Sequence, residues 1–177
     1  MRHLYHFSVI NRFYSRLNLE NTFHVEIGGG FGNLSRLLYQ YNLFERIFIV
    51  DFPALTAIQY FFLTEFIEES DISIWDGNEY LVGNESSRIC LVTADAYPKI
   101  QFPVGKKSFL SSNMAMTEIA KAGQDYYLKN HNYDYIYVSG QTISVSPPGG
   151  NNLVDLEANN NKALFKTLAE KYYPVLF

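Results

Sequence analysis

The stretch that most limits the fold of this chain is a glycine-rich turn between a strand pattern and a helix pattern. Residues 23–27 are short and rich in strand formers, and Gly28, Gly30 and Gly32 follow at alternate positions. Apolar side chains then recur at helical spacing through residues 34–41. Glycine permits positive φ and close approach of a ligand, and the helix start favours polar or anionic ligand atoms. The pattern predicts the first strand–turn–helix unit of a doubly wound α/β domain, where such folds bind ligands.

The spacing of the glycines indicates what kind of ligand the turn suits. A dinucleotide fingerprint, G-x-G-x-x-G, requires a third glycine where this chain has Asn33. The observed pattern is Glu-x-Gly-Gly-Gly-x-Gly, which places the acid Glu26 two residues before the first glycine. The next apolar strand pattern, residues 47–50, ends at Asp51, a candidate acceptor for ribose hydroxyls. Because Asn33 stands where the third glycine is required, the sequence disfavours a nicotinamide-dependent oxidoreductase.

This glycine pattern resembles motif I of the class I, Rossmann-like S-adenosylmethionine-dependent methyltransferases. In that family the turn lies against the methionyl end and ribose of the cofactor, and the preceding acid helps to bind the amino-acid part. The resemblance covers residues 23–141 and implies S-adenosyl-L-methionine as cofactor. The cofactor-binding residues that we predict on this basis are Glu26, Gly28, Gly29, Gly30, Gly32, Asp51, Phe52, Asp95, Ala96 and Asn113.

Two further segments resemble particular groups of methyltransferases. Asp51-Phe52-Pro53 looks like the Asp-Leu-Pro element of small-molecule O-methyltransferases. Residues 111–118 look like the Asn-x-x-Ser-x-x-Glu-Met region of predicted sugar O-methyltransferases, although the order of Met and Glu and the spacing differ. The resemblance thus implies methyl transfer to a sugar hydroxyl or a similar small polar acceptor.

Two acidic residues each have a functional and a structural interpretation. Asp95 follows the strand predicted at residues 89–93, where methyltransferases often place an acid by the adenine amino group; it is equally a turn aspartate before Pro98. Glu118 is the candidate catalytic residue, as a general base that accepts a hydroxyl proton. It could instead be a carboxylate in the first turn of a helix, stabilised by the helix dipole. No metal-binding motif is present.

Composition restricts the remaining function classes. A chain of 177 residues is expected to form one domain, here residues 21–177 preceded by an N-terminal helix over residues 1–20. The net charge of −4 disfavours a large nucleic-acid footprint. We expect a cytoplasmic protein, because Cys90 is the single cysteine, no signal peptide is indicated, and the longest apolar region is interrupted by polar residues.

The rest of the chain predicts alternating strands and helices, with the strands in a mostly parallel sheet and helices on both faces. Residues 71–88 carry turn signals around Trp75 but no clear element. The helix that opens at Pro53 is expected to turn Leu55, Ile58, Phe62 and Phe66 towards the core. The predicted strands are residues 23–27, 47–50, 89–93, 107–112 and 133–138; the predicted helices are residues 1–20, 33–41, 53–69, 118–130 and 155–173.

The C-terminal part departs from the family pattern. Methyltransferase sheets usually close with a sixth strand and an antiparallel seventh, but only residues 173–177 follow the last predicted helix. We therefore expect this C-terminal strand pair to be missing or shortened, unless residues 142–145 add a strand. A short natural variant, a fragment and half of a swapped dimer all remain open. An unpaired sheet edge favours association, so we expect a homodimer.

The sequence thus supports one main function and one alternative from a different class. The first is an S-adenosylmethionine-dependent O-methyltransferase that acts on a sugar hydroxyl or similar small acceptor, without nucleic acid or a membrane span. The alternative is a non-catalytic cofactor-binding module, or the partner subunit of a methyltransferase. The truncated C-terminal part and the lack of an obvious base motivate the alternative.

Overall fold

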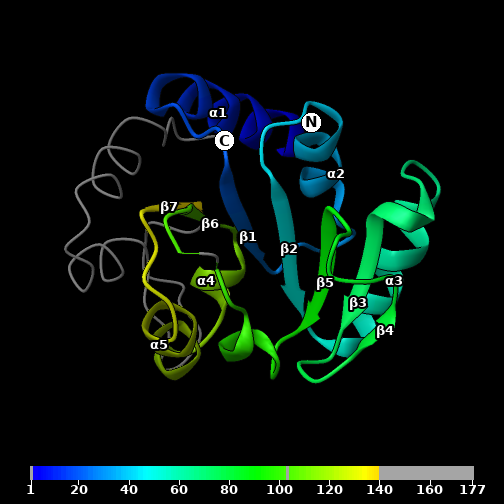
Figure 1. Ribbon diagram of the computed structural model, residues 1–177. Coiled ribbons are helices and arrows are strands. Elements are labelled where there is room, and N and C mark those ends of the chain that lie inside the picture. The colour runs from blue at the N-terminus through cyan, green and yellow to red at the C-terminus, as the bar shows by residue number, and fades with distance from the viewer. Residues whose placement is uncertain (1, 103, 140–177) are drawn as a thin grey trace.

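A computed structural model describes residues 2–102 and 104–139 (Figure 1). These residues form one seven-stranded sheet in the order β4-β3-β5-β2-β1-β6-β7, with only β4 antiparallel to its neighbour. The mostly parallel, Rossmann-like α/β sheet that the sequence predicts is therefore confirmed. The strands are β1 (Thr22–Ile27), β2 (Arg46–Asp51), β3 (Ile72–Trp75), β4 (Tyr80–Val82), β5 (Ile89–Thr93), β6 (Lys107–Asn113) and β7 (Tyr135–Ser139).

Helices cover both faces of this sheet, as predicted, because buried strands must hide side chains on two sides. Ile47 and Ile49 belong to the core beneath the first three helices, whereas Phe48 and Val50 belong to the core beneath the later ones. The first face is covered by α1 (Arg2–Leu17), α2 (Asn33–Gln40) and α3 (Pro53–Thr64); the second by η2 (Tyr97–Lys99), α4 (Ala115–Glu118) and α5 (Lys121–Lys129).

The segment without a clear assignment, residues 71–88, contains a short 3-10 turn, η1 (Glu69–Asp71), and the hairpin of β3 and β4. Strand β3 adds parallel to β5, and β4 pairs antiparallel with β3. These strands have only four and three residues, so neither produces a readable alternation. An antiparallel pair therefore does border the sheet, but it lies beyond β5 and between α3 and β5 in the chain.

The C-terminal predictions fall outside the described residues. They comprise the helix expected at residues 155–173, the extra strand at 142–145 and the missing or shortened strand pair. The last described strand, β7, begins at Tyr135 rather than at residue 133. Tyr133 is buried in the connection that precedes it.

The orientation predicted for α3 is wrong for Ile58 and Phe66, whereas Phe62 is partly buried and packs against the core as predicted. Its buried residues are Thr56, Gln59 and Leu63, whereas Ile58 is 43% exposed and Phe66 is 49% exposed. Polar contacts determine this rotation of the helix. The Gln59 amide donates to Asp51 Oδ2 and to the Gly30 carbonyl, each at 3.0 Å, and these bonds hold the polar side of the helix against the sheet.

The N-terminal helix α1 packs along α2 and buries Val9, Ile10 and Phe13 on the first face of the sheet. His6 of α1 is buried, and its Nδ1 lies 2.7 Å from the Tyr137 hydroxyl. Among the residues that the structure describes, no helix has both the length and the apolar character needed to cross a membrane.

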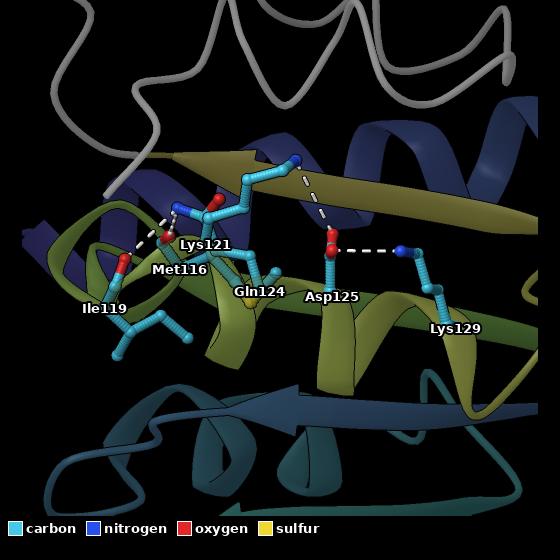
Figure 2. Close-up of polar contacts among 6 residues, drawn as sticks. All are labelled: Met116, Ile119, Lys121, Gln124, Asp125 and Lys129. Carbon is cyan, nitrogen blue, oxygen red and sulfur yellow. Dashed lines mark hydrogen bonds and ion pairs between the residues drawn. The ribbon is translucent and has the colours of Figure 1, made fainter. Parts of the chain in front are cut away.

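The helix predicted at residues 118–130 corresponds to α5, the separate short helix α4 ends where it was expected to begin, and Gln124 joins the two helices (Figure 2). Its buried Nε2 donates to the carbonyls of Met116 at 2.7 Å and Ile119 at 3.3 Å. These are carbonyls at the end of α4, which have no helical partner of their own. Farther along α5, Asp125 forms ion pairs with Lys121 and Lys129 at the surface.

Replacing Gln124 with leucine is expected to destabilise the fold by about 1–3 kcal/mol, because two carbonyl groups then lose a buried donor. Urea denaturation measures this loss of unfolding free energy. Asp125→Asn is the matched control on the same helix, since exposed ion pairs contribute only about 0–1 kcal/mol. If both variants lose the same stability, Gln124 is not the link between α4 and α5.

Candidate functional site

The candidate site lies where the order of the strands reverses. Strand β1 has β2 on one side and β6 on the other, so the chain leaves β1 in one direction and later returns past it. Open α/β sheets bind ligands outside the carboxyl ends of their strands at such a point. The three strands end at Ile27, Asp51 and Asn113, and the Gly28 amide donates to the Val50 carbonyl at 2.9 Å.

Two of the glycines are required by close packing within the protein. Gly28 has φ +72°, and a Cβ there would lie 2.3 Å from the Cβ of Ala115 at the start of α4. A Cβ on Gly29 would lie 2.5 Å from Ile49 Cγ2. The first half of the turn is therefore held against the two neighbouring strands and their helices.

Gly30 has a different environment. Its φ is +59°, and no atom lies within 4 Å of the position that a Cβ would occupy. Gly32, with φ +82°, caps the start of α2, and its amide donates to the Gly29 carbonyl at 2.9 Å. The turn therefore leaves open space over its backbone at Gly30, whereas a Cβ on Gly32 would lie 3.3 Å from Leu63 Cδ1. Open space of this kind is what a ligand that approaches the turn requires.

Glu26 lies buried directly before the turn. Its Oε2 accepts a hydrogen bond of 2.5 Å from the Ser35 hydroxyl, and its carboxyl group also accepts from the Ser35 backbone N–H. Burial, and to a smaller extent the nearby Asp51, raise the pKa of Glu26 to about 7, although the two bonds from Ser35 oppose the rise. Glu26 thus caps α2 in the structure and is also poised to change its charge near neutral pH.

Asp51 ends β2 beside the turn. Its Oδ1 accepts from the Phe52 amide at 2.9 Å and its Oδ2 from Gln59 at 3.0 Å; the Gly30 backbone N–H is a further donor. Burial raises the pKa of Asp51, and these donors oppose the rise. Phe52, the next residue, is 64% exposed. The carboxylate is therefore fixed in orientation next to an exposed aromatic ring.

The negative charge of this pair has no compensating cation in the described part of the chain. The ion pairs there join Lys106 to Glu45 and Asp125 to Lys121 and Lys129. Glu26 and Asp51 belong to none of them. The described residues also hold no group of three His, Cys, Asp or Glu side chains suited to a metal ion. Two close carboxyl groups without a counter-ion favour a cationic ligand.

The predicted residues after β5 lie at the same edge of the sheet. The Ala94 amide donates to the Asp51 carbonyl at 2.9 Å, which places this connection beside the end of β2. Asp95 is exposed, whereas Ala96 is buried and lies against Gly77 of the β3–β4 hairpin. The Tyr126 hydroxyl of α5 donates to the Ala94 carbonyl at 2.8 Å, so α5 also anchors this connection.

The end of β6 and the residues that follow it differ in their surroundings. Asn113 Oδ1 accepts from the Ser139 hydroxyl at 3.0 Å, while its Nδ2 is buried and has no hydrogen-bond partner among the described residues. Met114 then takes a positive φ of 78°, and its amide donates to the Ser139 carbonyl. Glu118, the candidate base, is exposed at the end of the four-residue α4.

Three residues that complete the site were not among the predicted ones. Ser35 binds Glu26, Gln59 binds Asp51, and Ala115 closes over Gly28. For Gln59 a signal existed, because it is a long polar side chain in an otherwise apolar helix. Ser35 and Ala115 carry no comparable signal, since small residues are common in helices and their contacts are made only in the folded protein.

Comparison with known proteins gives little further information. No family model matches the sequence. No curated protein matches it either. Among the solved structures that match is one described as "PigF with SAH", with 20% sequence identity and a TM-score of 0.40. The match covers 62% of this chain and 27% of that one, so this chain spans less than a third of that protein's length. At this similarity the match carries no argument about fold or function, and the site itself remains the evidence.

Proposed function

We propose that this chain binds S-adenosyl-L-methionine and transfers its methyl group to a hydroxyl oxygen of a sugar or a similar small polar acceptor. One observation supports the cofactor most directly. Two close carboxyl groups, Glu26 and Asp51, flank an open glycine turn and have no cation beside them among the described residues. S-adenosylmethionine carries positive charge on its ammonium and sulfonium groups, so it fits this site.

The acceptor groups of the site also fit the separate parts of the cofactor. Glu26 suits the ammonium group, and Asp51, whose orientation is fixed by Gln59, suits the ribose hydroxyls. The exposed ring of Phe52 offers an apolar surface for adenine, and Asp95 at the same edge is an acceptor for its amino group. A dinucleotide fits less well, because its anionic pyrophosphate would lie near Glu26.

When bound, S-adenosylmethionine supplies a methyl group attached to a positively charged sulfur. The main task of the chain is then to hold the acceptor hydroxyl in line with that group, and orientation alone can lower a barrier by about 7–11 kcal/mol. Glu118 is the candidate to take the hydroxyl proton, from an exposed position on α4 at the switch-point edge. The choice of a sugar rests on the resemblance of residues 111–118.

The alternative, a cofactor-binding module without turnover, has one observation in its favour. Glu118 is exposed, and among the described residues its hydrogen bond is the one that its backbone N–H donates to the Met114 carbonyl at 3.1 Å. A base that acts on a bound acceptor is commonly fixed by its surroundings. Conversion of S-adenosylmethionine to S-adenosylhomocysteine in the presence of sugar acceptors separates the two functions, and unchanged turnover in Glu118→Gln would remove Glu118 from the role of base.

Calorimetric titration with S-adenosylhomocysteine tests the cofactor assignment. We expect micromolar affinity for the unchanged chain and at least a tenfold loss in Asp51→Ala, about 1.4 kcal/mol, because the ribose loses its acceptor. Asp76→Ala is the matched control, since Asp76 is a half-buried aspartate in the β3–β4 turn whose carboxylate accepts from the Asn78 amide. A folded chain that does not bind S-adenosylhomocysteine would refute the proposal, as would equal affinities of both variants.

A further inference from the structure

Helix α3 presents an uncharged, apolar surface to solvent. Its 12 residues, Pro53 to Thr64, include no acidic or basic side chain. Ala54, Ile58 and Phe61 are exposed and follow one another at steps of four and three, so they lie in one row along the helix. Phe61, at 71% exposure, is the most exposed of the three. A surface helix normally turns such a row inward.

Aromatic rings extend this row sideways. Phe62 lies 6.3 Å from Phe31 of the glycine turn and 5.2 Å from Phe66 after the helix, measured between ring centroids. Phe31 and Phe66 are both exposed. We call this surface the α3 ridge; it consists of the exposed residues Phe31, Ala54, Ile58, Phe61 and Phe66 together with Phe62, which is partly buried against the core and contacts both neighbouring rings.

A rotation of α3 cannot turn the ridge towards the core without breaking hydrogen bonds on the opposite side of the helix. The opposite side carries Gln59, which is bound to Asp51 and to the Gly30 carbonyl, and Thr56, whose hydroxyl donates to the Phe52 carbonyl. Rotation would leave the Asp51 carboxylate without its side-chain donor. The same bonds that shape the candidate site therefore keep the ridge directed to solvent.

The area of the ridge is consistent with a protein interface. Taking roughly 200 Å² for a fully exposed phenylalanine side chain, Phe31, Phe61 and Phe66 together present on the order of 350–400 Å². A single soluble protein rarely exposes a larger contiguous apolar patch without a function for it. Two ridges, with Ile58 and the smaller residues included, reach about 1,000 Å², where specific interfaces begin.

We propose that the α3 ridge of a second copy of this chain covers this surface, with the two α3 helices antiparallel about a twofold axis. An isologous interface brings each residue near its own copy or near a symmetry-related one, so an uncharged helix avoids like-charge repulsion. Glu65 continues the row of Ala54, Ile58 and Phe61 at the C-terminal end of α3. In the antiparallel arrangement it faces the positive N-terminal end of the partner's helix.

Sedimentation equilibrium of the full chain, with single charges introduced at three surfaces, tests the proposal. The unchanged chain is expected to be a dimer at micromolar concentration. Phe61→Glu should raise the dissociation constant at least a hundredfold, because it buries a carboxylate in an apolar interface on both sides of the axis. Leu81→Glu on the edge strand β4 and Leu4→Glu on α1 change comparably exposed leucines and should leave the dimer intact.

Each other outcome overturns the proposal. A monomeric unchanged chain means that the ridge is covered by another part of the chain or by a different partner. A dimer that Phe61→Glu leaves intact and Leu81→Glu dissociates would instead assign association to the sheet edge. Circular dichroism confirms that each variant is folded, which is expected because all three side chains are exposed in the chain.

Discussion

Replacing Gly28 with alanine is expected to lower the free energy of unfolding by about 2–5 kcal/mol. A residue with a Cβ pays about 1–2 kcal/mol for the left-handed conformation that Gly28 adopts at φ +72°. The new Cβ also lies 2.3 Å from the Cβ of Ala115, and relief of this overlap moves α4 away from β1 at a cost of about 1–3 kcal/mol. Urea denaturation of the two proteins measures the difference.

Gly30→Ala is the matched variant, two residues along the same turn. Its φ of +59° carries a similar conformational cost, but its Cβ meets no atom within 4 Å. We therefore expect a loss of only about 1–2 kcal/mol in stability. The added methyl group occupies the open space over the turn, so affinity for S-adenosylhomocysteine should fall at least tenfold. Unchanged affinity in a folded Gly30→Ala protein would show that no ligand approaches the turn there.

The stability of the protein without ligand is expected to fall as the pH rises towards neutrality. Burial raises the pKa of Glu26 from 4.5 to about 7. Between these values the folded chain keeps a proton that the unfolded chain has lost, so the unfolding free energy decreases by about 1.4 kcal/mol per pH unit. The stabilising contribution is complete below pH 4.5 and is lost above pH 7.

Glu26→Gln separates this effect from the other titrating groups. Glutamine keeps the size of the side chain and an oxygen that can accept from Ser35, but it does not titrate. Urea denaturation between about pH 5 and pH 8 covers the shifted pKa. The unfolding free energy of the variant should depend less on pH in this range than that of the unchanged chain. Burial also raises the pKa of Asp51, which shifts the pH dependence of stability in the same direction. Parallel profiles for both proteins would contradict the role of Glu26.

The proton on the Glu26 carboxyl group also allows an independent test of ligand binding. An ammonium group beside Glu26 favours its ionised form, so binding of S-adenosylhomocysteine at about pH 6 should release most of one proton. Calorimetry in two buffers of different ionisation enthalpy measures this number. Glu26→Gln should bind without that release. Equal proton release by both proteins would mean that the ligand does not contact Glu26.

Local patterns in the sequence were sufficient for the elements that make the framework of the site. The strand before Gly28 is a short segment rich in strand formers, and the strand that ends at Asp51 is a short apolar run. Both are confirmed within one or two residues. The glycine turn was recognisable because few residues other than glycine adopt positive φ and allow other atoms to approach the backbone closely. Parallel order followed from alternation of strands and helices, since parallel neighbours require a crossover connection.

Tertiary contacts decided what periodicity could not. The sequence of α3 favours an apolar core stripe, yet Gln59 turns inward because Asp51 and Gly30, far away in the sequence, provide buried partners for its amide. The strands β3 and β4 are too short to be recognised alone and exist because β5 offers a parallel edge. Ser35 and Ala115 join the site only through contacts across the sheet.

The sequence by itself therefore determined the fold class, the position of the glycine turn and the two acids beside it, because these depend on neighbours along the chain. The tertiary structure alone decided the charge state of Glu26, the open space over Gly30 and the outward face of α3. Each of these depends on burial, and burial depends on residues that meet only after the sheet has assembled.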